Sequence, residues 1–531
     1  MDSMKAPFYP IIYVRGFAMS RGEIDETTAD PFCGFNLGST VMRAVPERDR
    51  PPRKFVFESP VIRLASDFGY SDVYEDGYDI LDPEWSDAQA NNFLSARSII
   101  VYRYYDPAST LLGIGKTPSM EEFGKGLSDL IVKVRDLACA NPANAIQVED
   151  FRCYLVAHSM GGLVCRTFLQ NPMCGSPEAR KAVDKFFTYA TPHNGIDVAG
   201  INVPDLPLPF EITNFNRSTR MPDYLNLPKT YGRVDLLPVG TLDPRKVFCL
   251  VGTNRSDYEV AAGLSRTFVG NGSDGLVRIE NATLHALNVD GTVGEECAKA
   301  FAYRSHSGFF GIVNSEEGYQ NLTRFLFGDV RVDLWLDIDD LRLPKSVVDA
   351  AAGRPVNALY QIELLASPRG KLWYLTRRTA EEDSVACVAH SSWQANPEVY
   401  LSSVFLANYA RVDPQRRSLA YSMTFGVRVP DYEIDRRLWS NEHYEGSYLY
   451  RDTVIIELEP PSAGSSKWRI NYAWQTTGVN SNGLELEAEQ LDSTGIQMEL
   501  PIDSDIEQNP ANPAIKGKLR LMISSWNKGD D

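Results

Sequence analysis

The stretch Tyr154-Leu155-Val156-Ala157-His158-Ser159-Met160-Gly161-Gly162-Leu163-Val164 decides the fold. Its apolar residues up to Ala157 are typical of a buried strand, and a helical pattern begins at Met160. Ser159 stands at the turn between them, with Ala157 and Gly161 two positions away on either side. A serine on such a strained strand-to-helix turn needs small neighbours, and its hydroxyl is exposed for attack. The stretch therefore predicts a nucleophilic serine.

Strand-like and helix-like segments alternate over the first 328 residues. Short apolar runs predict strands at 11–14, 99–104, 153–157, 186–190 and 247–252. Amphipathic runs predict helices at 120–138, 160–169 and 316–327. Ser119 precedes the first of these helices, and two glutamates in its first turn suit a helix start. This alternation predicts a mostly parallel sheet with helices on both faces.

The pattern changes near residue 329. From Val330 to Ile338, apolar residues alternate with others, as in a strand with one buried face. Similar runs, separated by Pro, Gly, Asp and Asn clusters, follow at 360–365, 400–406, 419–429, 454–458, 468–474, 496–500 and 519–523. Such short strands predict a β-sandwich-like domain. We therefore expect an α/β domain over 1–328 and an all-β domain over 329–531.

Two stretches of the first domain, 45–97 and 196–245, show no sustained period and are interpreted as insertions. Long connections in a compact enzyme domain are usually lids, binding loops or accessory subdomains. The second stretch holds the apolar run 201–212. This run either serves an acyl pocket or lid, or packs as a structural insertion, and the sequence favours neither.

Composition excludes several classes of protein. Of the 531 residues, 43% are hydrophobic and 23% are charged, which excludes a mostly disordered chain. The net charge of −17 argues against a nucleic-acid surface and against purely electrostatic docking on anionic membranes.

No transmembrane run and no secretory signal are recognisable, so we expect a cytoplasmic protein. Export by a route that needs no signal stays compatible with the sequence. The eight scattered cysteines are expected to be reduced.

The elbow Ala157-His158-Ser159-Met160-Gly161 resembles that of α/β-hydrolases of the lipase and esterase kind. Alanine here replaces the first glycine of the usual pattern. The resemblance covers residues from about 8 to 328, and it implies an α/β-hydrolase fold. In that fold the catalytic acid and then the histidine follow the serine along the chain.

Asp274 and His306 fill the two remaining positions of the expected triad. Asp274 lies in Asp-Gly-Leu-Val, which resembles the acid loop of these lipases, and Asp290 in a second Asp-Gly turn is its rival. His306 follows a strand-like run and precedes the last helix, where the family places its general base. His285 lies inside an apolar run and is the weaker candidate.

The resemblance also implies two backbone donors for an oxyanion. One is the N–H of Met160, the residue after the nucleophile, and the other is the N–H of Phe17. Gly16 lets the backbone turn toward the site. Arg15 stands where family members often have histidine, and a structural ion pair and a substrate role are equally compatible with it.

His158 and His193 are expected to support the site rather than to react. His193 lies in Thr-Pro-His-Asn-Gly directly after a predicted strand, so it borders the site, but it precedes the acid in the chain. It is also a lone candidate for a metal ligand. Because no clustered His, Cys, Asp or Glu spacing accompanies it, no metal site is predicted.

These residues predict a carboxylic-ester hydrolase that works through a serine acyl-enzyme and needs no cofactor. A phospholipase, including an antibacterial lipase effector, would share the triad, and an amide or thioester hydrolase is also compatible. A non-catalytic binding protein on a hydrolase fold is the alternative from another class. The expected partners are an ester or lipid substrate, and either a membrane surface or a protein at the C-terminal domain.

Overall fold

The computed structural model describes residues 4–16, 35, 39–43, 53–57, 59–75, 78–79, 93–104, 118–198, 201–202, 214–255, 272–308, 311–434, 442–461, 467–476, 484–485, 489–490, 495–505 and 507–527. Two compact units emerge from the contacts within the chain. Unit 1 comprises 1–299 and 303–326, and unit 2 comprises 300–302 and 327–531. No helix in the described ranges combines the length and apolarity that a membrane crossing requires.

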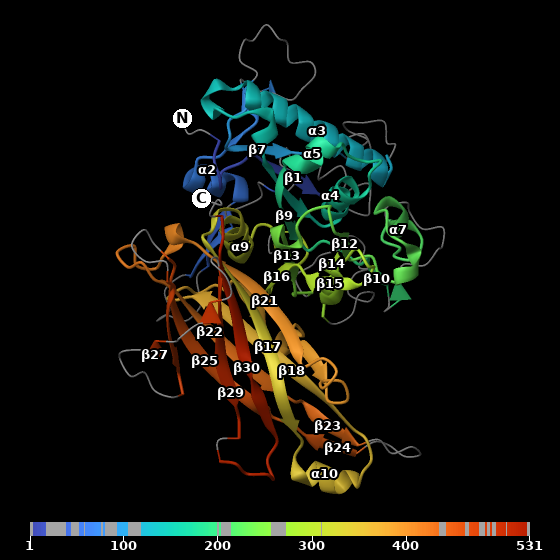
Figure 1. The fold of residues 1–531 in the computed structure, drawn as a ribbon, viewed down its shortest axis with the longest axis vertical. Helices are drawn as coiled ribbons and strands as arrows, with labels where there is room; N and C mark the ends of the chain where they lie inside the picture. The colour runs from blue at the N-terminus through green and yellow to red at the C-terminus, as the bar shows by residue number, and fades with distance from the viewer. Residues whose placement is uncertain are drawn as a thin grey trace. The chain divides into compact units, whose positions relative to one another are not determined.

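A seven-stranded sheet organises unit 1 (Figure 1). Its order is β16-β13-β9-β8-β1-β7-β4. The strands in chain order are β1 (Ile11–Arg15), β4 (Ser71–Asp72), β7 (Ser98–Val101), β8 (Cys153–His158), β9 (Val183–Tyr189), β13 (Val247–Gly252) and β16 (Ala298–Ala302). Along the sheet, each pair of neighbouring strands from β13 through β9, β8, β1 and β7 to β4 is parallel. From β1 the chain goes to the edge strand β4 and returns through β7, and it then crosses β1 to β8 and continues outward through β9, β13 and β16. The direction of the connections therefore changes beside β1, which makes this a topological switch point.

Side chains alternate between the two faces of this sheet, and both faces are covered. Ile12 and Val14 of β1 belong to the hydrophobic core that includes residues of α3 (Met120–Ala140) and α4 (Met160–Gln170). On the other face, the rings of Phe187 and Phe248 lie 5.9 and 5.3 Å from Phe325 of α9 (Glu316–Phe327). The predicted α/β architecture is thereby confirmed, with strands buried on both sides as parallel sheets require.

The long helix α3 forms where its sequence predicts it. Its first turn has a capping box, in which the Ser119 hydroxyl accepts from the Glu122 N–H and the Glu122 carboxylate accepts from the Ser119 N–H. Its buried residues recur at helical spacing, including Phe123, Leu127 and Ile131. The cap therefore fixes where the helix starts, and the apolar stripe fixes which face packs inward.

The two expected insertions contain ordered elements. Within 45–97, α2 (Pro60–Phe68) begins at the Ser59 cap, and β4 is an edge strand of the central sheet. The smaller elements of unit 1 are β2 (Ser39–Arg43), β3 (Arg53–Phe57), β5 (Tyr74–Glu75), β6 (Tyr78–Asp79), α5 (Pro177–Ala182), β10 (Asp197–Val198), β11 (Ile201–Asn202), α7 (Arg220–Tyr224), β12 (Leu236–Pro238), β14 (His285–Leu287) and β15 (Val293–Glu296). Most of the apolar run 201–212 lies outside the described residues.

Unit 2 is built from two antiparallel sheets (Figure 1). The smaller sheet has the order β21-β17-β30-β29-β28, with β17 (Val330–Arg342), β21 (Glu398–Leu406), β28 (Glu489–Gln490), β29 (Gly495–Asp503) and β30 (Ala514–Ser525). The larger sheet has the order β24-β23-β18-β22-β25-β26-β27, and β19 and β20 also pair with β18. Its strands are β18 (Val356–Pro368), β19 (Thr376–Arg378), β20 (Ala386–Ala389), β22 (Leu419–Arg428), β23 (Asp431–Ile434), β24 (Glu442–Glu445), β25 (Tyr448–Glu459), β26 (Arg469–Trp474) and β27 (Leu484–Glu485).

One hydrophobic core joins the two sheets of unit 2. Leu334 of β17 and Leu521 of β30 share it with Tyr421 and Phe425 of β22. The period-two pattern therefore predicts the buried faces correctly, and a sandwich-like fold is confirmed. The short helix α10 (Lys345–Ala351) was not predicted, because its two turns are too short to establish a helical period.

The closest backbone approach around the elbow gives a first prediction. A Cβ on Gly161 would lie 1.8 Å from the Val14 carbonyl oxygen, so Gly161→Ala must push α4 away from β1. We expect it to lower the free energy of unfolding by about 3 kcal/mol or more. Gly426→Ala is the control, because its Cβ would meet neighbours only at 3.4 Å and beyond. Chemical unfolding of both variants measures this, and equal stability of the two would contradict the prediction.

Candidate active site

Ser159 occupies the turn between β8 and α4. Its φ of 55° and ψ of −130° are uncommon for a residue with a side chain. The Ser159 N–H donates to the Tyr189 carbonyl of the neighbouring strand at 3.0 Å, which holds the turn in place. The serine therefore lies at the carboxyl edge of the central sheet, where α/β proteins place their ligands.

His306 lies between Ser159 and Asp274. Its Nε2 is 2.8 Å from the Ser159 Oγ, and its Nδ1 is 2.9 Å from the Asp274 Oδ2. Asp274 and His306 are almost completely buried, at 1% and 3% exposure, and Ser159 is 8% exposed. A carboxylate accepting from Nδ1–H leaves the Nε2 lone pair directed at the hydroxyl. The structure thus brings three distant residues into one hydrogen-bonded chain.

The backbone holds Asp274 in this orientation. Its Oδ1 accepts from the N–H groups of Leu276 and Val277 at 3.0 and 2.8 Å, which leaves Oδ2 for the histidine. The His306 N–H also donates to the Asp274 carbonyl at 3.0 Å. Gly252, the last residue of β13, makes room for this loop, because a Cβ there would lie 2.7 Å from the Asp274 Cβ. The acid and the histidine are therefore fixed relative to each other.

The rival residues lie elsewhere. Asp290 is in the exposed turn between β14 and β15, where its carboxylate accepts from the N–H and hydroxyl of Thr292. These bonds lower the pKa of Asp290. His285 is in β14, with its Nε2 3.9 Å from the Asp235 carboxylate. Neither residue contacts His306 within the described part of the chain.

The region expected to bind an oxyanion begins at Met160, the first residue of α4. Its N–H has no acceptor one turn back, because the first N–H groups of a helix lack intrahelical partners. Gly16 lies against this amide, since a Cβ on Gly16 would be 2.4 Å from the Met160 nitrogen. The Gly16 N–H donates to the His158 carbonyl at 2.7 Å. Phe17, the expected second donor, lies outside the described residues.

His158 contacts the loop that carries His306. Its Nε2 is 2.8 Å from the His306 carbonyl oxygen. Because a carbonyl only accepts, the Nε2 carries the proton and donates. Burial, followed by the nearby His306 and Arg15, lowers the pKa of His158 well below its usual value. His158 therefore stays neutral at pH 7 and keeps this single donor orientation.

A small pocket opens beside these residues. Arg15, His158, Ser307, Gly308 and Asn314 are among the residues that line it. Arg15 is the last residue of β1, in register with His158 of β8. Arg15 therefore lies next to the candidate site, and the choice between a structural ion pair and a substrate role stays open.

His193 is completely buried and supports the loop after β9. Its Nε2 lies 3.2 Å from the Thr188 hydroxyl, and its carbonyl accepts from the Arg166 guanidinium at 2.9 Å. Arg166 also donates to the carbonyls of Val234 and Leu236. Burial lowers the pKa of Arg166 to about 10, so it remains charged at pH 7. Among the described residues, no cluster of three or more His, Cys, Asp or Glu is arranged to hold a metal.

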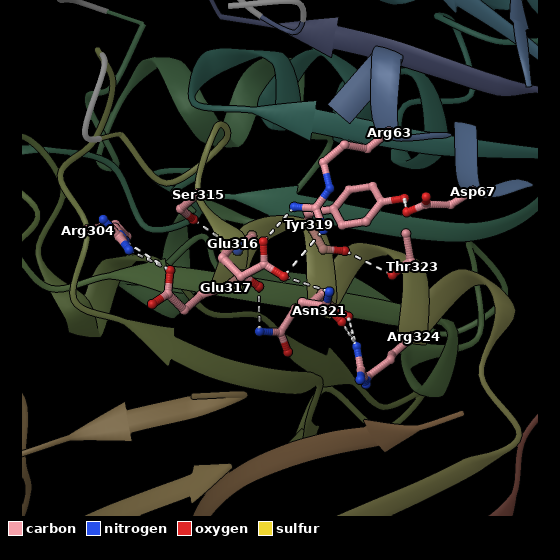
Figure 2. Close-up of polar contacts among 12 residues, drawn as sticks. Arg63, Asp67, Arg304, Ser315, Glu316, Glu317, Tyr319, Asn321, Thr323 and Arg324 are labelled. Atoms are coloured by element: carbon pink, nitrogen blue, oxygen red, sulfur yellow. Dashed lines mark hydrogen bonds and ion pairs between the residues drawn. The ribbon is translucent and has the colours of Figure 1, made fainter. Parts of the chain in front are cut away.

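Ionic contacts tie α9, the helix after the His306 loop, to α2. The Arg63 guanidinium lies 3.6 Å from the centre of the Tyr319 ring, and its Nη1 donates to the Glu316 carboxylate at 2.7 Å (Figure 2). The Tyr319 hydroxyl donates to Asp67 at 2.7 Å. These side chains were missed in the sequence, because their partners lie about 250 positions away and no local pattern connects them.

The loop itself is closed by contacts at its two ends. The Arg304 guanidinium, two residues before His306, binds the Glu317 carboxylate at 2.9 Å (Figure 2). The Ser315 hydroxyl accepts from the Gly318 N–H at 2.9 Å, as a serine does at the start of a helix. Both ends of the 304–315 segment are therefore attached to the first turn of α9.

The matches to this chain are solved structures. No family model and no curated protein matches the sequence. The mature lipase BlEst2 of Bacillus licheniformis is 15% identical, with a TM-score of 0.27 over 61% of this chain and 92% of that chain. The phospholipase PlaB of Legionella pneumophila is 13% identical, with a TM-score of 0.29 over 82% of this chain and 90% of that chain. At TM-scores this low the likeness does not bear on function.

Proposed function

We propose that the chain hydrolyses carboxylic esters through an acyl-enzyme on Ser159. The observation that carries this proposal is the chain of short hydrogen bonds from Ser159 through His306 to Asp274. A hydroxyl next to the imidazole lone pair, with a fixed carboxylate behind the ring, is the arrangement of an activated nucleophile. A serine with only a structural role has no need of this arrangement.

The proposed reaction has two halves. In the first, the Ser159 oxygen attacks the ester carbonyl carbon while the His306 Nε2 takes its proton, and that proton then passes to the departing alcohol. In the second, a water molecule loses a proton to His306 and attacks the acyl-serine, and Ser159 recovers its proton as the acid leaves. Asp274 stabilises the imidazolium that exists between these transfers.

The oxyanion of each tetrahedral intermediate needs donors that are in place beforehand. We propose the N–H groups of Met160 and Phe17 for this role. The position of Gly16 supports the assignment of Met160. Gly16 is the first residue after β1, and it lies directly against the Met160 N–H. No cofactor takes part in this scheme.

We also propose that residues 1–328 carry the chemistry and that residues 329–531 serve an accessory function. Each of the proposed catalytic side chains precedes residue 307. The substrate we propose is an ester or a lipid, since the same triad hydrolyses both.

The first test of the chemistry is Ser159→Ala. We expect it to fold normally and to reduce turnover of a p-nitrophenyl ester by a factor on the order of 10⁶. It should also abolish labelling by a fluorophosphonate. Ser392→Ala, at an exposed turn of unit 2, is the control and should keep both activities. Substantial turnover by folded Ser159→Ala would rule out the proposed nucleophile.

The second test separates the two aspartates. Asp274→Asn should lower kcat by roughly 10⁴, because an amide in place of the carboxylate no longer accepts from Nδ1–H and the wrong tautomer is favoured. Asp290→Asn should have little effect, since that carboxylate bonds only its own turn. Steady-state kinetics on the same ester measures both, and the reverse ranking would show that the acid is wrongly assigned.

The third test concerns His158, which we propose as a positioning residue with His193 in a similar supporting role. His158→Leu removes the donor to the His306 carbonyl, and a shift of the catalytic ring by about 1 Å should lower kcat roughly 100-fold with little change in KM. His158→Gln places an amide N–H near the former Nε2 and should restore most of kcat. If both variants lose only stability and keep kcat, His158 has no positioning role.

A further inference from the structure

A basic and apolar surface lies at one end of the larger sheet of unit 2. Two segments form it: the turn 369–373 between β18 and β19, and the segment 409–418 that leads into β22. The Arg369 N–H donates to the Ala420 carbonyl at 3.0 Å, and Pro368 is in register with Tyr421. The two segments therefore emerge from neighbouring strand ends, and we call them together the β18–β22 tip.

Large apolar side chains are exposed at this tip. Leu372 is fully exposed, at 100%, and Tyr409 and Val412 are 49% and 47% exposed. Trp373, next to Leu372, is half-buried and packs against the core of unit 2, which anchors the turn. Exposed apolar side chains that are grouped on one part of a surface mark sites that contact other molecules.

Positive charge is concentrated at the same end of the sheet. Leu419 pairs with Leu458 and Arg469 pairs with Glu459, so the end of β25 and the start of β26 lie at this end. The basic residues of these segments are Arg369, Lys371, Arg411, Arg416, Arg417, Lys467 and Arg469, and the acidic ones are Asp413, Glu457 and Glu459. Seven cations against three carboxylates is an excess of four, in a chain whose net charge is −17.

Only part of this charge is neutralised within the protein. Arg369 binds Glu457 at 3.1 Å, and Arg416 lies 3.5 Å from Asp413. Lys371, Arg411 and Arg417 have no ion pair in the ranges that the structure describes. Lys371 and Arg417 are exposed, so their charges face solvent.

We propose that the β18–β22 tip docks on an anionic phospholipid surface. The cations attract the headgroups, and Leu372 enters the boundary between headgroups and acyl chains with Trp373 at the interface. A nucleic acid would be bound by charge but would leave Leu372 without an apolar environment. None of the tip residues belongs to the candidate active site, so this proposal stands independently of the proposed hydrolysis.

The test is flotation of the full chain with lipid vesicles, in a Ser159→Ala background so that no lipid is consumed. We expect binding to phosphatidylcholine vesicles containing phosphatidylglycerol and much weaker binding to phosphatidylcholine alone. Lys371→Glu/Arg417→Glu should weaken binding to the anionic vesicles roughly tenfold or more. Leu372→Ser should weaken it several-fold, because the apolar contact is lost.

Matched controls keep the test specific. Lys125→Glu/Lys181→Glu makes the same change in net charge on exposed helix positions of unit 1, and Val289→Ser removes a 92% exposed valine. Both controls should bind like the parent chain. Absence of binding, equal binding to both vesicle types, or equal losses in controls and tip variants would each overturn the proposal.

Hydrolysis is measured separately, with Ser159 present and a soluble ester as substrate. The tip variants should hydrolyse it at the rate of the parent chain. Failure of the parent to hydrolyse this ester would contradict the proposed function, and the vesicle result would still decide the docking proposal.

Discussion

The close approach of α4 to β1 is the constraint on which the rest of the site depends. Gly161 touches the Val14 carbonyl and Gly16 touches the Met160 amide, so neither position has room for a Cβ. Because both contacts exist, Ser159 is held with positive φ at the carboxyl edge of the sheet. The same two contacts bring the loop after β1 next to the first free N–H of the helix. Backbone packing, rather than any side chain, thus places the proposed nucleophile and one proposed oxyanion donor together.

Around this backbone frame, the polar side chains of the site are arranged so that each has one orientation. Backbone N–H groups occupy one oxygen of Asp274, and His158 is kept neutral by burial so that it donates only to the His306 carbonyl. The Arg63–Glu316 and Arg304–Glu317 pairs then attach the helix that follows. Partly exposed ion pairs contribute little net stability, so their value here is in fixing geometry.

The sequence predicts those parts of the protein that depend on local periodicity. The capped helix α3, the elbow and the alternation of β17 were all predicted, because each pattern is complete within about 20 residues. The choice between Asp274 and Asp290 is different, since both occur in Asp-Gly turns and the sequence favours Asp274 only through the Leu-Val that follows it. The folded chain places Asp274 against His306 and Asp290 in an exposed turn. The contacts of Arg63 and Arg166 join segments far apart in the chain, and β4 is too short to show a strand period. Pairings of this kind arise from packing and leave no local signal.

Net charge and local charge lead to different expectations for membrane contact. An overall charge of −17 opposes approach to an anionic surface if all charges act together. At physiological ionic strength, however, charges are screened beyond about 8 Å, so an approaching surface responds mainly to the groups that face it. At the β18–β22 tip those groups are predominantly cationic, and Leu372 adds an apolar contact that salt does not screen. Attraction at the tip and repulsion elsewhere would then act together, because they favour a single orientation of unit 2 on the lipid. An acidic chain with one basic and apolar end is in this way better suited to oriented docking than a uniformly basic chain.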